Sequence, residues 1–136
     1  MRVQNRGFTL IETLAATAIL MFGLAAVASA FGYCAGASLQ NQQRAAATLL
    51  LHDKMEQLKW TPLSGAPWTA GGGLNSEAPA AGFSEYVTQN GVTFLRMWQI
   101  SGTVPRTATV AVYAPAASWR PRPMEMVRGT LVSAGW

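Results

Sequence analysis

The sequence contains few charged side chains. Asp, Glu, Lys and Arg make up 12% of its 136 residues, about half the usual share in soluble domains. Disordered chains and chains that mainly bind nucleic acid both need dense charge, so the composition excludes both classes. The net charge is +4, and Arg2 and Arg6 supply two of these charges. The remaining balance is too small to predict partners by electrostatics.

Residue types that carry catalysis are also scarce. His52 is the single histidine and Cys34 the single cysteine, which excludes a histidine-based triad and a Cys/His zinc site. One cysteine also excludes an intramolecular disulfide. The acids are scattered, and the glycines at 71–73 are not followed by the Lys-Ser/Thr pair of a phosphate loop. We therefore expect no enzyme, no cofactor and no metal, and we expect His52 to be a solvated helix residue.

The longest charge-free stretch lies near the N-terminus. No Asp, Glu, Lys or Arg occurs in the 31 residues between Glu12 and Arg44. A helix needs about 20 apolar residues to span a bilayer, so we expect a membrane-spanning helix that reaches about residue 39. No proline occurs before Pro62, which predicts a helix without a proline kink.

The helix is expected to continue beyond the membrane. Residues 45–59 are rich in strong helix formers. Their apolar members recur at helical spacing and predict one buried stripe: Ala47, Leu51, Met55 and Leu58. Trp60-Thr61-Pro62 should end the helix, because the residue before proline avoids helical geometry.

An apolar N-terminus fits an ordinary secretory signal, a lipoprotein signal or an anchor that docks into an assembly within the membrane. An ordinary secretory signal would be cut after Ala30, at Ala28-Ser29-Ala30, and would release a soluble binding domain that starts at Phe31. A lipoprotein signal is excluded because the bulky Tyr33 precedes Cys34. A carboxylate at Glu12 is costly in an apolar segment, and an ordinary signal has no need for it. Glu12 either pairs with a positive group on a neighbouring protein or lies among lipid head groups.

The residues around Glu12 resemble a known family. Arg6-Gly7-Phe8-Thr9-Leu10-Ile11-Glu12 resembles the leader and cleavage motif of type IV pilins and type II secretion pseudopilins. The resemblance implies that prepilin peptidase cuts between Gly7 and Phe8 and methylates Phe8. It also implies that Glu12 neutralises the amino terminus of an adjacent subunit. Such pairing is physically sensible, because an amine and a carboxylate in hydrocarbon are far less costly together than apart.

The resemblance also implies an organisation and a location. Residues 1–7 would be a cleaved basic leader, 8–60 the N-terminal helix and 61–136 a globular domain. The partners would be other subunits, bound through the N-terminal helix, together with the peptidase and the inner-membrane assembly platform. The chain would cross the bacterial inner membrane once, with its C-terminal domain in the periplasm, and would then enter a pilus or pseudopilus.

The last part of the sequence predicts a small antiparallel sheet. Residues 63–82 contain a triple glycine and prolines, and are expected to form a long loop. Strands are expected over residues 85–88, 92–100, 108–113 and 126–133. Asn90-Gly91 joins the first two and is a strong hairpin signal. On the second strand, Phe94, Arg96, Trp98 and Ile100 should share one face.

The predicted fold class is therefore α+β, a long N-terminal helix packed on a small antiparallel sheet. The stretch Lys54-Met55-Glu56-Gln57-Leu58 and the order of strands resemble V-type minor pilins and I-type minor pseudopilins. That resemblance is loose after residue 60. It implies a minor subunit that primes or decorates filament assembly, either in a type IV pilus or in a type II secretion system.

One loop carries two arginines beside an indole, at Trp119-Arg120-Pro121-Arg122-Pro123. Trp119, Arg120 and Arg122 could stack on or neutralise a polyanion such as a nucleic-acid strand. The alternative, which we favour, is a solvated loop held by one anchored tryptophan. Nucleic acid is therefore not an expected partner.

Overall fold

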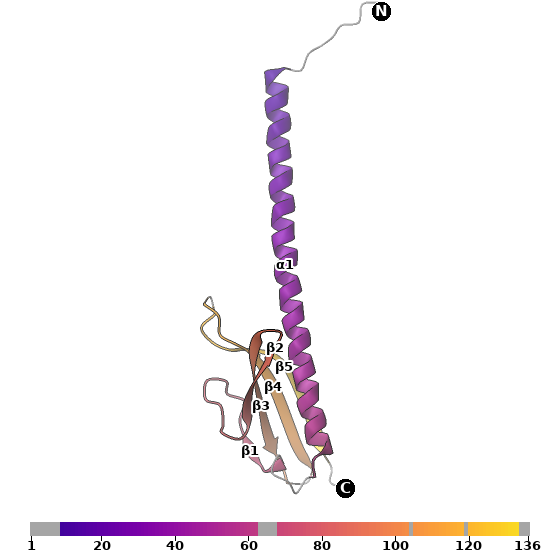
Figure 1. Ribbon diagram of the computed structural model, residues 1–136, viewed down its shortest axis with the longest axis vertical. Coiled ribbons are helices and arrows are strands. Elements are labelled where there is room, and N and C mark those ends of the chain that lie inside the picture. The colour runs from indigo at the N-terminus through magenta and orange to yellow at the C-terminus, as the bar shows by residue number, and fades with distance from the viewer. Residues whose placement is uncertain (1–8, 63–67, 104, 119, 134–136) are drawn as a thin grey trace, which may run out of the picture. The chain divides into compact units, whose positions relative to one another are not determined.

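The computed structural model describes residues 9–62, 68–103, 105–118 and 120–133. The chain divides into two compact units, one ending at Gln40 and the other covering Asn41–Trp136, and each is described by itself. The elements, shown in Figure 1, are one helix, α1 (Leu10–Trp60), and five strands: β1 (Gly71–Gly72), β2 (Ser84–Gln89), β3 (Val92–Ser101), β4 (Arg106–Ala114) and β5 (Met124–Ser133).

Helix α1 ends where the sequence predicts. It runs without interruption from Leu10 to Trp60, and proline is absent until Pro62. At its end the Thr61 N–H donates to the carbonyl of Leu58 (3.2 Å), and the Thr61 hydroxyl donates to the carbonyl of Gln57 (2.7 Å). These two bonds satisfy carbonyls that a helix end otherwise leaves without partners.

The strands form one antiparallel sheet in the order β1-β3-β4-β5, and β2 pairs with β3. The pairing confirms the predicted α+β class. The β2–β3 hairpin turns at Asn90 (φ 51°) and Gly91 (φ 75°), two consecutive left-handed residues of the kind that asparagine and glycine tolerate. The strand order could not be predicted from the sequence.

The prediction of an unbroken loop over residues 63–82 is wrong in one place. Gly71 and Gly72 pair with Ile100 and Gln99 as strand β1. A Cβ at Gly72 would collide with the carbonyl oxygen of Trp98, and the residue has a φ of 83°. Glycine is therefore required at position 72, because the two backbones approach closely there. From composition alone, the triple glycine indicates only a flexible loop.

The main core lies between the second half of α1 and one face of the sheet. Ala47, Leu51 and Leu58 of the predicted stripe are buried, and Met55 is half-buried. Alternate residues of β3 and β4 face them, as the two-residue period of a strand requires: Phe94, Trp98, Ile100, Ala108, Val110, Val112 and Ala114. The Trp68 indole N–H donates to the carbonyl of Leu58 (2.9 Å) and fixes the chain after the helix.

A second, smaller cluster lies on the other face of the sheet. It contains Leu95, Met97, Ala111 and Tyr113, with Leu74 packed against it. The Tyr113 hydroxyl donates to the carbonyl of Leu74 (2.6 Å), so the segment after β1 is tied across this face. Burial, and then the nearby charge of Glu125, raise the pKa of the Tyr113 hydroxyl above its ordinary value. Both faces of β3 are therefore covered.

Candidate functional site

The first described residues form a helix start that includes Glu12. The carbonyl of Thr9 accepts from the N–H groups of Glu12 (3.0 Å) and Thr13 (3.2 Å). The Thr9 N–H lies 3.5 Å from Glu12 Oε2, at the long limit for a hydrogen bond. Glu12 thus occupies the first turn, where the helix dipole favours a negative charge. Gly7 and Phe8, the expected cleavage residues, lie outside the described residues.

This arrangement gives Glu12 a local role that the sequence analysis missed. Thr9 and Glu12 stand three residues apart immediately before an apolar run, which is the sequence pattern of a capping box. Because the contact is long and exposed, it leaves the carboxylate accessible to another cation. The two roles of Glu12 are therefore compatible in one subunit.

The first part of α1 presents apolar side chains on every side. Among the residues from Leu10 to Gln40 none is buried, and the exposed fractions reach 78% at Phe22 and 82% at Tyr33. The helix is long and apolar enough to cross a membrane. Apolar surface of this extent is unfavourable in water and fits a bilayer or the surface of other apolar helices.

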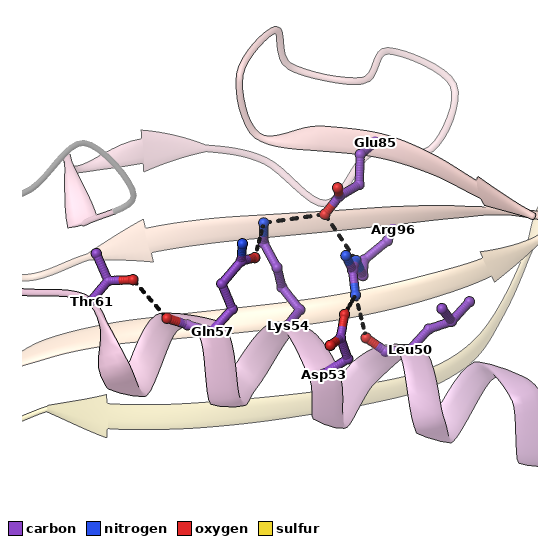
Figure 2. A network of polar contacts seen from close by, with 7 residues as sticks. All are labelled: Leu50, Asp53, Lys54, Gln57, Thr61, Glu85 and Arg96. Atoms are coloured by element: carbon purple, nitrogen blue, oxygen red, sulfur yellow. Dashed lines mark hydrogen bonds and ion pairs between the residues drawn. The ribbon is translucent and has the colours of Figure 1, made fainter.

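The second half of α1 is fixed to the sheet by a buried cluster of charges (Figure 2). Arg96 of β3, only 5% exposed, donates from Nε to Glu85 Oε1 (2.9 Å). Its Nη1 donates to the carbonyl of Leu50 and to Asp53 Oδ2, both at 2.8 Å. A single side chain of the sheet thus binds two residues of the helix and one of β2.

Lys54 is the second buried cation of this cluster, and the helical stripe predicted from the sequence did not include it. It is 7% exposed, its Nζ lies 3.2 Å from Glu85 Oε1, and it donates to Gln57 Oε1 at 3.0 Å. The same ammonium lies 3.7 Å from the centre of the Trp98 ring, a cation–π contact. As Figure 2 shows, the Glu85 carboxylate lies between the Lys54 and Arg96 cations.

The charges of this cluster determine the acidity of Glu85. Burial works to raise the pKa of its carboxyl group, but the hydrogen bonds and positive charges of Arg96 and Lys54 outweigh burial. The pKa of Glu85 is therefore lowered below its ordinary value. The carboxylate is held ionised at neutral pH, as the pairing of two buried cations requires.

The arginine loop is joined to the rest of the domain. Arg120 Nη2 donates to the carbonyl of Pro115 (2.9 Å), and Arg122 Nε lies 3.0 Å from Glu77 Oε1. Trp119 lies outside the described residues. Each of these two arginines therefore has an acceptor within the chain.

The described residues hold no group of three or more His, Cys, Asp or Glu that could bind a metal ion. His52 is exposed on α1, and Cys34 is an exposed free thiol in the apolar part of the helix. The residues that stand out in this chain are therefore those of the helix start, the apolar helix and the buried charge cluster.

Comparison with known families bears on the helix start. Residues 2–28 match the family model described as the prokaryotic N-terminal methylation motif. This match supports a type IV pilin-like prepilin. The matched segment contains Gly7, Phe8 and Glu12 and extends into the exposed apolar part of α1. No curated protein and no solved structure matches the chain significantly.

A prepilin-type subunit accounts for the otherwise unusual N-terminus. The motif and the apolar helix fit membrane anchoring and assembly with other pilin-type subunits. They also suggest a structural subunit in place of an enzyme.

Proposed function

We propose that this chain is a minor pilin, a structural subunit that primes or decorates the assembly of a type IV pilus. The observation that carries the proposal is the methylation motif at residues 2–28, which overlaps a helix whose residues from Leu10 to Gln40 are unburied and mostly apolar. Prepilin peptidase would remove residues 1–7 and methylate Phe8. The helix, residues 8–60, would span the inner membrane to about residue 39, and residues 61–136 would form the periplasmic domain.

The assembly step follows from where Glu12 lies. Its carboxylate is exposed at the first turn of α1, four residues from the amino group that cleavage after Gly7 would create. In a bundle of parallel helices it would neutralise the amino terminus of the adjacent subunit. This pairing avoids leaving two isolated charges in an apolar surrounding, each of which would cost several kcal/mol.

Two alternative functions predict different locations or cleavage sites for the mature protein. A minor pseudopilin of a type II secretion system would use the same leader and helix, and would be found in a secretion pseudopilus in place of a surface pilus. A soluble exported domain would be cut after Ala30 by the ordinary signal peptidase. The methylation motif at residues 2–28 favours the anchored subunit over this second alternative.

The leader assignment is tested by producing the full chain with an active or an inactivated prepilin peptidase. We expect loss of residues 1–7 with the active enzyme only, read from the intact mass. Gly7→Val should block cleavage. Gly23→Val is the matched control and should be cut normally, because a Cβ at Gly23 meets no atom within 4 Å. Cleavage after Ala30, or a Gly7→Val chain that is cut as well as the natural one, would contradict the proposal.

A further inference from the structure

Part of the apolar contact between α1 and the sheet repeats along the helix. Ala47 and Leu51 are both buried and stand four residues apart. Residues four apart share a helix face and are separated by about 6 Å along the axis. If α1 slipped by four residues along the sheet, Ala47 would take the place of Leu51, and apolar side chains would still meet there. The same slip would bring Lys54 to the fully buried position of Leu58, so the charge of Lys54 itself opposes it.

The charged contacts do not repeat. A slip by four residues in one direction would put Leu49 and Leu50 where the structure has Asp53 and Lys54. A slip in the other direction would put Gln57 and Leu58 there. In both cases Arg96 would lose Asp53 and keep Glu85, and Glu85 would lose the ammonium of Lys54. A buried cation that loses a partner is costly, so the polar contacts penalise either slip.

We propose that the buried cluster of Lys54, Glu85 and Arg96 fixes the register of α1 on the sheet. The register is a property of the unit Asn41–Trp136 and does not depend on the proposed function.

The test follows the register by disulfide formation in the full chain in detergent micelles, with Cys34→Ser as the background. The native reporter is Leu51→Cys with Gly129→Cys. A Cβ at Gly129 would lie 3.1 Å from Leu51 Cδ2 and 2.9 Å from Met55 Sδ, the end of a flexible side chain that can move aside. The slipped reporter is Ala47→Cys with Gly129→Cys. Mild oxidation and peptide mass spectrometry measure each disulfide. With the charge cluster intact, we expect the native disulfide to exceed the slipped one at least tenfold.

Each reporter is then combined with Lys54→Met, Glu85→Leu and Arg96→Met, which replace the cluster by apolar side chains. We expect the two disulfides to form in comparable amounts, a loss of most of the tenfold preference. If this chain does not fold, Lys54→Met with Glu85→Gln alone is used, and the slipped disulfide should still rise severalfold.

The matched control removes a surface ion pair by Glu77→Gln with Arg122→Gln, and it should keep the natural preference. An unchanged preference for the native disulfide in the chain without the cluster would overturn the proposal, since packing alone would then set the register. Neither result depends on cleavage after Gly7, so failure here is distinguishable from failure of the proposed function.

Discussion

Replacing Glu85 by glutamine is expected to destabilise the domain by about 2 kcal/mol at pH 7. The substitution keeps the size of the side chain but leaves Lys54 and Arg96, two cations exposed by 7% and 5%, without their shared carboxylate. Removing one partner of a buried pair costs about 3–5 kcal/mol, and the 36% exposure of the Glu85 side chain places the effect below that range. Thermal unfolding of the full chain in detergent, followed by near-ultraviolet circular dichroism, measures the change.

The matched control is Glu77→Gln, which removes the partner of Arg122 at the surface. Those side chains are 54% and 80% exposed, so we expect at most about 1 kcal/mol. The pKa of Glu85 is lower in the folded chain than in the unfolded chain, where it is 4.5. The ionised carboxylate therefore contributes its full stabilisation above pH 4.5, and this stabilisation is lost as the pH falls through the pKa of the folded state. The Glu85→Gln chain should therefore lose less stability on acidification. Equal effects of the two substitutions would argue against the buried cluster.

Replacing Glu12 by alanine is expected to leave cleavage and methylation intact and to reduce incorporation into filaments by about 100-fold. An amino terminus that loses its carboxylate partner in an apolar surrounding is less stable by about 3 kcal/mol, which corresponds to that factor. Quantitative mass spectrometry of sheared filaments and of membranes measures incorporation and processing in the same cells. Glu56→Ala, on an exposed part of the same helix, is the control and should assemble normally.

A second variant separates docking from capping. Glutamine also occurs at the third helical position of capping boxes, so Glu12→Gln keeps an acceptor for the Thr9 N–H while it removes the charge. We expect it to assemble as poorly as Glu12→Ala. If Glu12→Gln is incorporated normally while Glu12→Ala is not, the role of Glu12 is to cap its own helix. That result would contradict the docking role.

Local patterns in the sequence predict the long helix, its end at Trp60, four of the five strands and the hairpin at Asn90-Gly91. These features depend on contacts between near neighbours, on the period of apolar residues and on proline and glycine. Strand β1 escapes such patterns because it has two residues, both glycine, and because its requirement is the close approach of Trp98. The capping pattern of Thr9 and Glu12, by contrast, is local and is present in the sequence as Thr-x-x-Glu before an apolar run.

The charge cluster could not be predicted in this way. Arg96 is 46 residues from Leu50 and 43 from Asp53 in the sequence, and no local period relates them. The predicted stripe consists of apolar residues and does not include Lys54, and a lysine is seldom buried without a partner. Its partner, Glu85, is supplied by a strand that reaches the helix only in the folded domain.

The most direct test of the account is the N-terminal peptide and intact mass of the protein purified from the membranes of its own host. The account predicts a mature chain that begins at Phe8, lacks residues 1–7 and carries one methyl group on its amino terminus. A chain that begins at Phe31 would contradict it, because the mature protein would then contain neither Glu12 nor most of the apolar helix.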